Sequence, residues 1–238
     1  HTTIAGAPDK EQLGNDLKIG DLNADGRRDL VLGAHWGSTG GRNIVGRAYA
    51  LFGRTAWPAA IDMAQQVPGR WSFMGVGREA RLGVSVATGD VSGDGRDDLV
   101  IGSLLADPFD QANAGAVYAM FGGPQAGGAV DFLQTTPDVV IAGNSTPFEA
   151  DRLGTDVAVG DFNGDGHGDI AAAAVLRNDF AGTVYVWFGP FVKGRVINTR
   201  NVAPDRTIHG TAPRGYFGTS LVAADADTDG RIDLVVGA

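Results

Sequence analysis

A nine-residue pattern, Asp-x-Asn-x-Asp-Gly-x-x-Asp in its third copy, occurs four times along this chain. The copies begin at Asp21, Asp90, Asp161 and Asp225, which are 69, 71 and 64 residues apart, and position 6 is Gly in each of them. A period of this length is typical of folds built from repeated supersecondary units, because one such unit cannot bury its hydrophobic surface alone.

Short apolar segments surround each copy of the pattern. One opens with Leu-Gly or Phe-Gly and leads into the loop, a second follows the loop, a third ends in Phe-Gly, and a fourth ends in Gly. Such runs, separated by turn residues, predict short strands. We expect second strands at 30–33, 99–102, 170–173 and 234–237, third strands at 48–53, 116–122 and 183–189, and fourth strands at 3–6, 72–75, 140–143 and 207–210.

Four antiparallel strands per repeat, rich in Gly and aromatic residues, predict an all-β fold, the β-propeller of four-stranded antiparallel blades. A tandem array of independent small domains is the alternative, but a lone four-stranded sheet cannot bury both of its faces, which favours stacking. We expect a single, incomplete propeller domain over residues 1–238, with repeats at about 9–75, 76–143, 144–210 and a partial one at 211–238, which makes about three and a half blades. An open arc of this kind is expected to be part of a larger ring or assembly.

The acidic residues of this chain are unusual in kind, since Asp accounts for 25 of the 28 acids. Asp favours turns and ligand loops over helical surfaces, so the imbalance agrees with the loop pattern. A net charge of −9 disfavours a nucleic-acid partner. The chain has no Cys, which excludes disulfide scaffolds, thiolate zinc sites and Cys nucleophiles. We see no transmembrane segment, because no window approaches about 20 apolar residues.

Oxygen-bearing side chains occupy positions 1, 3, 5 and 9 of each copy, and this spacing predicts a cation site. Alternate residues of a tight turn can direct their oxygens inward, and the Gly at position 6 lets the chain reverse around one centre. All the side-chain donors are oxygens and several are carboxylates, which favours Ca²⁺ over zinc, copper or Mg²⁺. Position 7 is expected to offer its backbone carbonyl, and its side chain is expected to be irrelevant to the metal. The candidate ligands, one site per repeat and about four Ca²⁺ in all, are Asp21, Asn23, Asp25, Arg27 and Asp29; Asp90, Ser92, Asp94, Arg96 and Asp98; Asp161, Asn163, Asp165, His167 and Asp169; and Asp225, Asp227, Asp229, Arg231 and Asp233.

Two other structures could carry an Asp- and Gly-rich pattern of this kind. An EF-hand needs a Glu at position 12, but that position holds an apolar residue in all four copies, so this is a calcium loop within a β-hairpin. An Asp- and Gly-rich turn could also be held by its own side-chain to backbone hydrogen bonds. Four copies in register favour the metal site, because a turn alone requires far fewer acids. We therefore expect chelation to destabilise the blades, since the crowded carboxylates would repel one another.

The Leu/Phe-Gly pair, the calcium loop and the run Gly-x-Val-Tyr-x-x-Phe-Gly at 115–122 and 182–189 resemble FG-GAP repeats, the blades of the integrin α-subunit N-terminal β-propeller. The resemblance extends over essentially the whole chain, although the Gly-Ala-Pro element is degenerate, as in Gly33-Ala34-His35. It implies a calcium-stabilised propeller, usually seven-bladed and extracellular, which serves in adhesion or presents a ligand-binding face. Calcium loops of this kind commonly bind in the range of extracellular calcium, which also favours a secreted or cell-surface protein.

In an up-and-down blade the calcium loops lie on one face, and the loops between second and third strands lie on the other. We expect a protein or glycan ligand on that opposite face, and we find no catalytic residues or organic cofactor site, which favours a non-enzyme. Two other functions stay open: a structural subunit that self-associates to complete the ring or a fibre, and the propeller of a secreted carbohydrate- or lipid-active enzyme, such as a polysaccharide lyase or a phospholipase. The candidate ligand-face residues are Trp36, Arg42, Arg78, Phe109, Asp110, Phe148, Arg177, Phe180, Arg214 and Tyr216.

Overall fold

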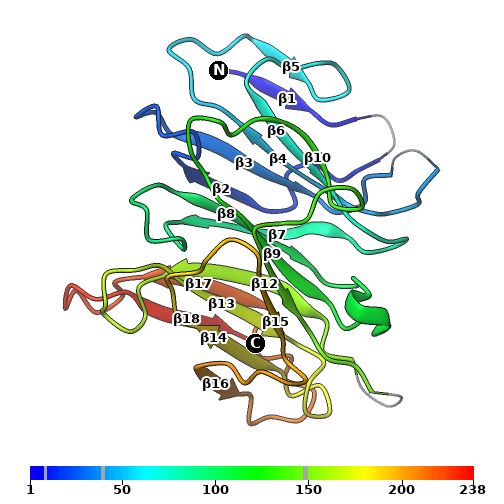
Figure 1. Cartoon of the computed structure of the whole chain (residues 1–238), viewed down its shortest axis with the longest axis vertical. Helices are drawn as coiled ribbons and strands as arrows, with labels where there is room; N and C mark the ends of the chain where they lie inside the picture. Colours follow the sequence, from blue (N-terminus) through cyan, green and yellow to red (C-terminus); the bar gives the residue numbers. More distant parts are fainter. Residues whose placement is uncertain (8–9, 39–40, 147–149) are drawn as a thin grey trace.

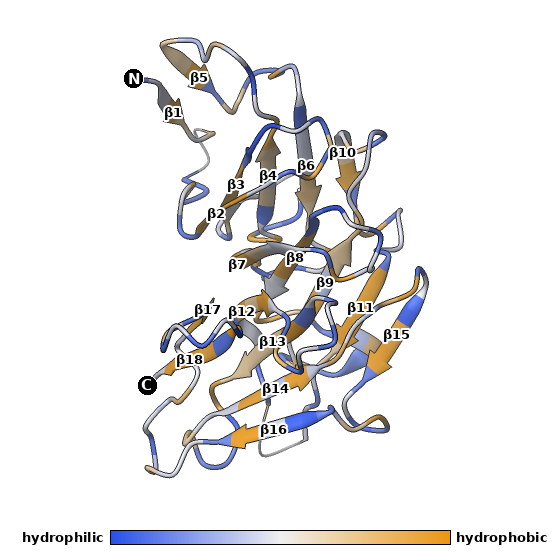
Figure 2. Ribbon diagram, turned by 90° about the vertical axis from the view of Figure 1, so that its left-hand side faces the viewer, coloured by the Kyte–Doolittle hydropathy of each residue, from blue (hydrophilic) through white to orange (hydrophobic). Residues whose placement is uncertain are grey.

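The computed structural model describes residues 1–7, 10–38, 41–146 and 150–238. The chain folds into an all-β arc of stacked sheets, which follow one another from the N-terminus to the C-terminus (Figures 1 and 2). Strand neighbours within each repeat are antiparallel, as a β-propeller with four-stranded blades requires.

Three sheets contain four consecutive antiparallel strands each. The first holds β2 (Leu17–Gly20), β3 (Asp29–Ala34), β4 (Arg47–Leu51) and β6 (Arg70–Met74). The second holds β7 (Leu82–Gly89), β8 (Asp98–Ser103), β9 (Ala116–Met120) and β11 (Val139–Ala142). The third holds β12 (Leu153–Gly160), β13 (Asp169–Ala174), β14 (Thr183–Trp187) and β16 (Arg206–His209). A final hairpin pairs β17 (Ser220–Ala224) with β18 (Asp233–Gly237), and the short 3-10 helix η1 (Pro108–Asp110) lies between β8 and β9.

The central sheets are buried on both faces, and side-chain alternation along β8 shows why they stack. Leu99 and Ile101 belong to the apolar cluster shared with the first sheet, whereas Val100 between them belongs to the cluster shared with the third. All three residues are fully buried. Successive side chains of a strand point to opposite faces, so an unbroken apolar strand needs a neighbouring sheet on each side.

The Leu-Gly motif marks a close approach between neighbouring sheets. Gly83 has a φ of +81°, and a Cβ at this position would lie 2.0 Å from the carbonyl oxygen of Arg47 in the preceding sheet. Only Gly combines this left-handed conformation with the space available. The motif therefore fixes how closely each sheet packs on the one before it.

The structure contains one type of strand that the sequence did not reveal. Between the third and fourth strands of each complete repeat, a short strand crosses back and pairs in parallel with the fourth strand of the preceding repeat. We call these the strap strands. They are β5 (Ala60–Asp62), which pairs with β1 (Thr3–Ala5); β10 (Gly128–Asp131), which pairs with β6; and β15 (Arg195–Asn198), which pairs with β11.

Apolar side chains remain exposed at both ends of the arc. On β2, Leu17 is 53% and Ile19 is 63% exposed, and on the last hairpin Val222 is 51% and Val235 is 48% exposed. The corresponding positions of the inner sheets are buried between neighbours, for example Val100. The two ends thus present the surfaces that stack elsewhere in the molecule.

Candidate metal-binding loops

The four Asp-rich patterns form the hairpin loops that join the first and second strands of each repeat. In every case position 9 pairs with the residue that precedes position 1, as in the pairs Gly20–Asp29, Gly89–Asp98, Gly160–Asp169 and Ala224–Asp233. The inner strands therefore hold the two ends of each loop together. All four loops lie at equivalent positions of the stacked sheets.

Inside the loops, side-chain oxygens accept hydrogen bonds from backbone amides further along the turn. In the third loop, Asp161 accepts from the backbone N–H groups of Asp165 at 3.0 Å and Gly166 at 2.8 Å. The Asn163 carbonyl oxygen also accepts from Asp165 N–H, at 2.9 Å, and Asp165 accepts from His167 N–H, at 2.9 Å. These bonds bend the chain around its own carboxylates, and they bring the oxygens of positions 1, 3 and 5 together.

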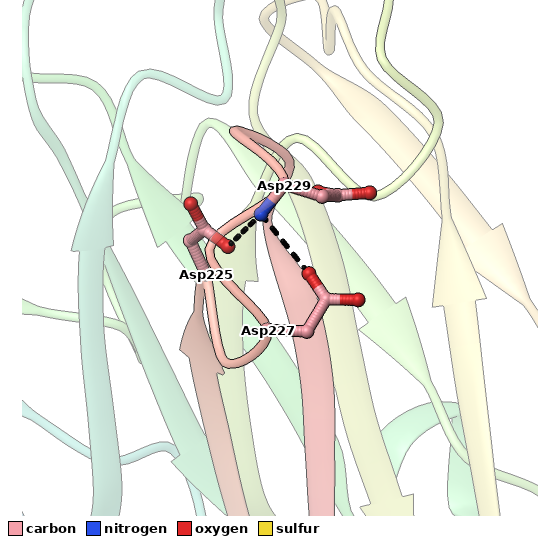
Figure 3. A group of neighbouring side chains, drawn as sticks. All are labelled: Asp225, Asp227 and Asp229. Carbon is pink, nitrogen blue, oxygen red and sulfur yellow. Dashed lines mark hydrogen bonds between the residues drawn. The ribbon is translucent and has the colours of Figure 1, made fainter.

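The fourth loop shows this convergence most directly. Asp225 and Asp227 both accept from the backbone N–H of Asp229, each at 3.1 Å (Figure 3). One carboxylate oxygen from each of Asp225, Asp227 and Asp229 lies within 4.8 Å of the others. Three converging carboxylates fit a hard cation with oxygen ligands, and Ca²⁺ accepts such flexible sets. The donor set of this loop therefore fits calcium.

The first and second loops repeat the arrangement, but at position 3 they offer an amide oxygen and a hydroxyl oxygen, respectively, in place of a carboxylate. Asp21 and Asp90, at position 1, accept from the backbone N–H of positions 5 and 6 at 2.7–3.1 Å. Asn23 accepts from Asp25 N–H at 3.2 Å, and the Ser92 hydroxyl lies 3.4 Å from Asp90. All the side-chain donors are oxygens, so these loops fit the same class of cation.

In the first three loops, position 9 differs from the other candidate ligands because it is buried, whereas Asp233 of the fourth loop is half-buried. Asp29, Asp98 and Asp169 are fully buried, and each of their two oxygens accepts one backbone N–H. For Asp169 the donors are Phe162 at 2.9 Å and Gly189 at 3.0 Å, so this carboxylate joins the loop to the end of β14. Burial raises the pKa of Asp29 and Asp169, and it raises that of Asp98 to about 6. Each oxygen keeps a further lone pair, so position 9 can bond the backbone and still offer an oxygen to a cation.

The Arg side chains at position 7 contact the position 5 carboxylates in the first and second loops. The Arg96 guanidinium lies 2.8 Å from the Asp94 carboxylate, and Arg27 lies 3.4 Å from Asp25. A backbone hydrogen bond from Arg27 is the main cause that lowers the pKa of Asp25. The basic side chains thus partly neutralise the position 5 carboxylates at the surface of the loop, and a bound divalent cation would compete with them.

The sequence pattern also gave no role to position 8, where Asp97 links two loops. Its carboxylate accepts from the backbone N–H of Asp21 in the preceding loop at 2.8 Å, and the Arg28 guanidinium lies 3.2 Å from the same oxygen. A cleft of about 590 Å³ lies between the third and fourth loops, and its lining includes Asp161 and Asp229. Neighbouring loops are therefore close enough to be coupled through shared polar contacts.

On the opposite side of the sheets, several candidate ligand-face residues are held by contacts within the protein. The Arg81 guanidinium stacks 4.7 Å from the centre of the Trp36 ring. Arg42 pairs with Asp131 at 2.6 Å, and Arg177 pairs with Asp151 at 2.8 Å. These side chains have structural partners, which accounts for their presence in the loops.

The aromatic residues of these loops are more accessible. Phe109 is 58% exposed, and Phe180 and Tyr216, whose rings meet edge to face at 6.1 Å, are 38% and 42% exposed. All three have positive φ values between 50° and 63°, which is uncommon for aromatic residues. Arg78, Asp110 and Arg214 are exposed as well, and Phe148 lies outside the described residues.

The FG-GAP repeat profile matches residues 82–120 and 153–187. The chain is 28% identical over 235 residues to the phosphatidylinositol-glycan-specific phospholipase D of Homo sapiens, which covers 95% of this chain and 26% of that protein. It is 32% identical over 239 residues to integrin alpha-V of Gallus gallus, which covers 97% of this chain and 20% of that protein.

These curated relatives are several times longer than the chain, which spans only 26% and 20% of their lengths. Among solved structures, rhamnogalacturonan lyase YesW aligns with a TM-score of 0.48 and 13% identity, over 98% of this chain and 42% of that one. Within the described residues, none of the helical segments has the length and apolar character to cross a membrane.

Proposed function

The chain carries FG-GAP repeats and is similar to integrin α subunits, and on this premise we propose that it is an extracellular calcium-binding β-propeller that recognises a ligand without catalysing a reaction. The observation that carries the proposal is the recurrence of one loop geometry four times. Each loop gathers acidic oxygens around its own reversed backbone. A rigid scaffold with loops pinned in this way is suited to presenting a binding surface.

Calcium would be held by the oxygens of positions 1, 3, 5 and 9 and by the position 7 carbonyl, and it would neutralise the clustered carboxylates. The affinity class of such loops supports the extracellular assignment, because extracellular calcium modules have dissociation constants of about 0.1–1 mM. At cytosolic calcium levels these sites would be mostly empty. The sites would then contribute little stability inside a cell.

The ligand would bind on the side opposite the calcium loops, where exposed aromatic side chains occur. Phe109, Phe180 and Tyr216 are the accessible aromatic residues named above. Aromatic side chains supply large contact areas at low conformational cost and are enriched at binding surfaces. A protein or glycan partner fits this surface better than a nucleic acid, since the chain carries a net charge of −9.

Two measurements test this proposal. Calorimetric titration of the chelator-treated chain with CaCl₂ should give about four sites, and the Asp225→Ala variant should lose one. Binding of the calcium-loaded chain to arrays of glycans and extracellular proteins should then fall in the Phe180→Ala and Tyr216→Ala variants. Leu133→Ala, which removes another exposed apolar side chain, is the matched control. Absence of calcium binding would refute the proposal.

The similarity to phospholipase D supports a second function, in which the chain is the propeller part of a secreted lipid-active enzyme. Its role there would be to bind the substrate or to position a separate catalytic domain. The test compares hydrolysis of a glycosylphosphatidylinositol-anchored protein by a separate phospholipase catalytic domain with and without this chain. Hydrolysis that requires the propeller would favour this function over simple recognition.

Self-association is a third possibility that the exposed ends support. Leu17 at one end, and Val222 and Val235 at the other, correspond to positions that are buried between inner sheets. Light scattering after size exclusion tests it, and a strictly monomeric chain at high concentration would remove it.

A further inference from the structure

The strap strands define a pairing rule between successive repeats. In each case the strap strand runs parallel to the fourth strand of the repeat before it, and the last residue of the strap lies opposite the residue that precedes the terminal Gly. The register pairs are Asp62 with Ala5, Asp131 with Met74, and Asn198 with Ala142. Three independent segments of the chain therefore use one register.

The strap strands also share a short sequence that explains how they end. A β-branched residue is followed directly by Asp or Asn, and the Asp or Asn Oδ1 accepts from the backbone N–H two residues later at 2.9–3.0 Å. This turn directs the intervening N–H onto the paired fourth strand at 2.9–3.1 Å. The three dipeptides are Ile61-Asp62, Val130-Asp131 and Ile197-Asn198.

The fourth strand β16 lacks this partner within the part of the chain that the structure describes. It pairs with β14 on one side and forms the outer edge of its sheet, and all four of its residues, Arg206–His209, are exposed. Ile208 is 39% exposed, whereas Phe73 and Ile141, at the equivalent positions of the strapped sheets, are fully buried. The edge thus presents the same backbone groups and apolar position that a strap strand covers in the other sheets.

We propose that the open edge of β16 binds, in parallel, an extended segment in which Val or Ile is followed by Asp or Asn, the kind of segment that a further repeat of this family would supply. The Val or Ile lies opposite Ile208, and the Asp or Asn lies opposite His209. Main-chain hydrogen bonds provide the attachment, as in other cases of strand addition, and the β-branched residue covers the apolar position. The inference is independent of the calcium loops and of the proposed ligand face.

Because the chain contains no Cys, site-specific disulfide capture tests the register directly. A single thiol is introduced on β16 by Thr207→Cys. Synthetic peptides spanning residues 125–136, which include the strap strand β10, are added with one Cys at position 127, 129 or 133. In β10 it is Ala129 that lies opposite Ser72, the residue of β6 equivalent to Thr207. The peptide with Cys at position 129 should therefore cross-link at least about fivefold faster than the other two, since a fixed register places one residue opposite another.

Two controls keep the result interpretable. The Ser72→Cys chain carries its thiol on a strand already paired with β10, and it should not capture the peptide. A peptide with Val130→Lys and Asp131→Ala should react with the Thr207→Cys chain several-fold more slowly than the parent. On the unmodified chain, the parent peptide should slow amide hydrogen exchange within residues 206–209. Equal rates for the three Cys positions, or equal capture of the altered peptide, would overturn the proposal.

Discussion

Removal of single carboxylates from the third loop separates the metal role of these loops from their structural role. Asp169 is fully buried, and it accepts the backbone N–H groups of Phe162 and Gly189. Asp165 is exposed, and within the described residues it accepts one backbone N–H, that of His167. The two side chains occupy positions 9 and 5 of the same loop, so each variant is the control for the other.

The expected magnitudes differ because the two removals leave different groups unpaired. Asp169→Ala leaves two backbone N–H groups without an acceptor, at about 1–3 kcal/mol each, so the free energy of unfolding should fall by roughly 2–6 kcal/mol even in chelator. Asp165→Ala should change the chelated protein little. In about 10 mM calcium, a site with a dissociation constant of about 0.1–1 mM stabilises the folded state by roughly 1.4–2.7 kcal/mol, and Asp165→Ala should remove this gain for its own loop.

Urea unfolding followed by circular dichroism, in chelator and in calcium, measures both quantities for the parent chain and the two variants. The parent chain should show a calcium-dependent gain, and Asp165→Ala should show a smaller one. The reasoning fails if the two variants are equally destabilised in chelator, because the buried hydrogen bonds of Asp169 would then stabilise the fold no more than the exposed one of Asp165. It also fails if calcium leaves the parent chain unchanged.

Two further predictions concern the stacking of the sheets. Gly115→Ala places a Cβ 2.3 Å from the carbonyl oxygen of Leu153 at a φ of +74°, so the thermal midpoint should fall sharply, with a cost of at least about 2–3 kcal/mol. Burial raises the pKa of Asp156 to about 6, although backbone hydrogen bonds from Leu221 in the next sheet and from Val157 lower it. Because the pKa is higher in the folded state, the folded state is favoured when the Asp156 carboxyl is protonated. This stabilisation of the folded state is fully present below about pH 4 and is lost as the pH rises through 6. The loss is on the order of 2–3 kcal/mol, and calorimetric scans from pH 4 to 7 should show a flatter profile for Asp156→Asn than for the parent chain.

The strands were predictable because their patterns are local. An unbroken apolar run such as Leu99-Val100-Ile101 has to bury both faces, and the Asp- and Gly-rich segments that separate the runs can only turn. The convergence of the loop oxygens likewise follows from hydrogen bonds between residues two to five positions apart. Rules that act over a few residues were therefore enough to predict most of the strands and most of the loop geometry.

The strap strands were not predictable by the same rules. They are three or four residues long, and each pairs with a strand of another repeat, so no local period reveals them. The recurring β-branched residue with Asp or Asn, as in Val130-Asp131, was the available signal, but its meaning depends on a partner more than fifty residues away. The hydrogen bond that Asp97 accepts from Asp21 was not predictable for a similar reason, because Asp21 lies in the preceding loop.

The strap strands also determine how the molecule can be divided. The first and second four-stranded sheets each take their outermost strand from the repeat that follows, so a cut between two repeats removes a strand from the sheet on its N-terminal side. Unfolding of one repeat must therefore expose the edge of the fourth strand in the preceding sheet. The stack of sheets is thus not equivalent in its two directions. Local unfolding should therefore spread more easily toward the N-terminus than toward the C-terminus, because each strap strand that is lost uncovers the sheet that precedes it.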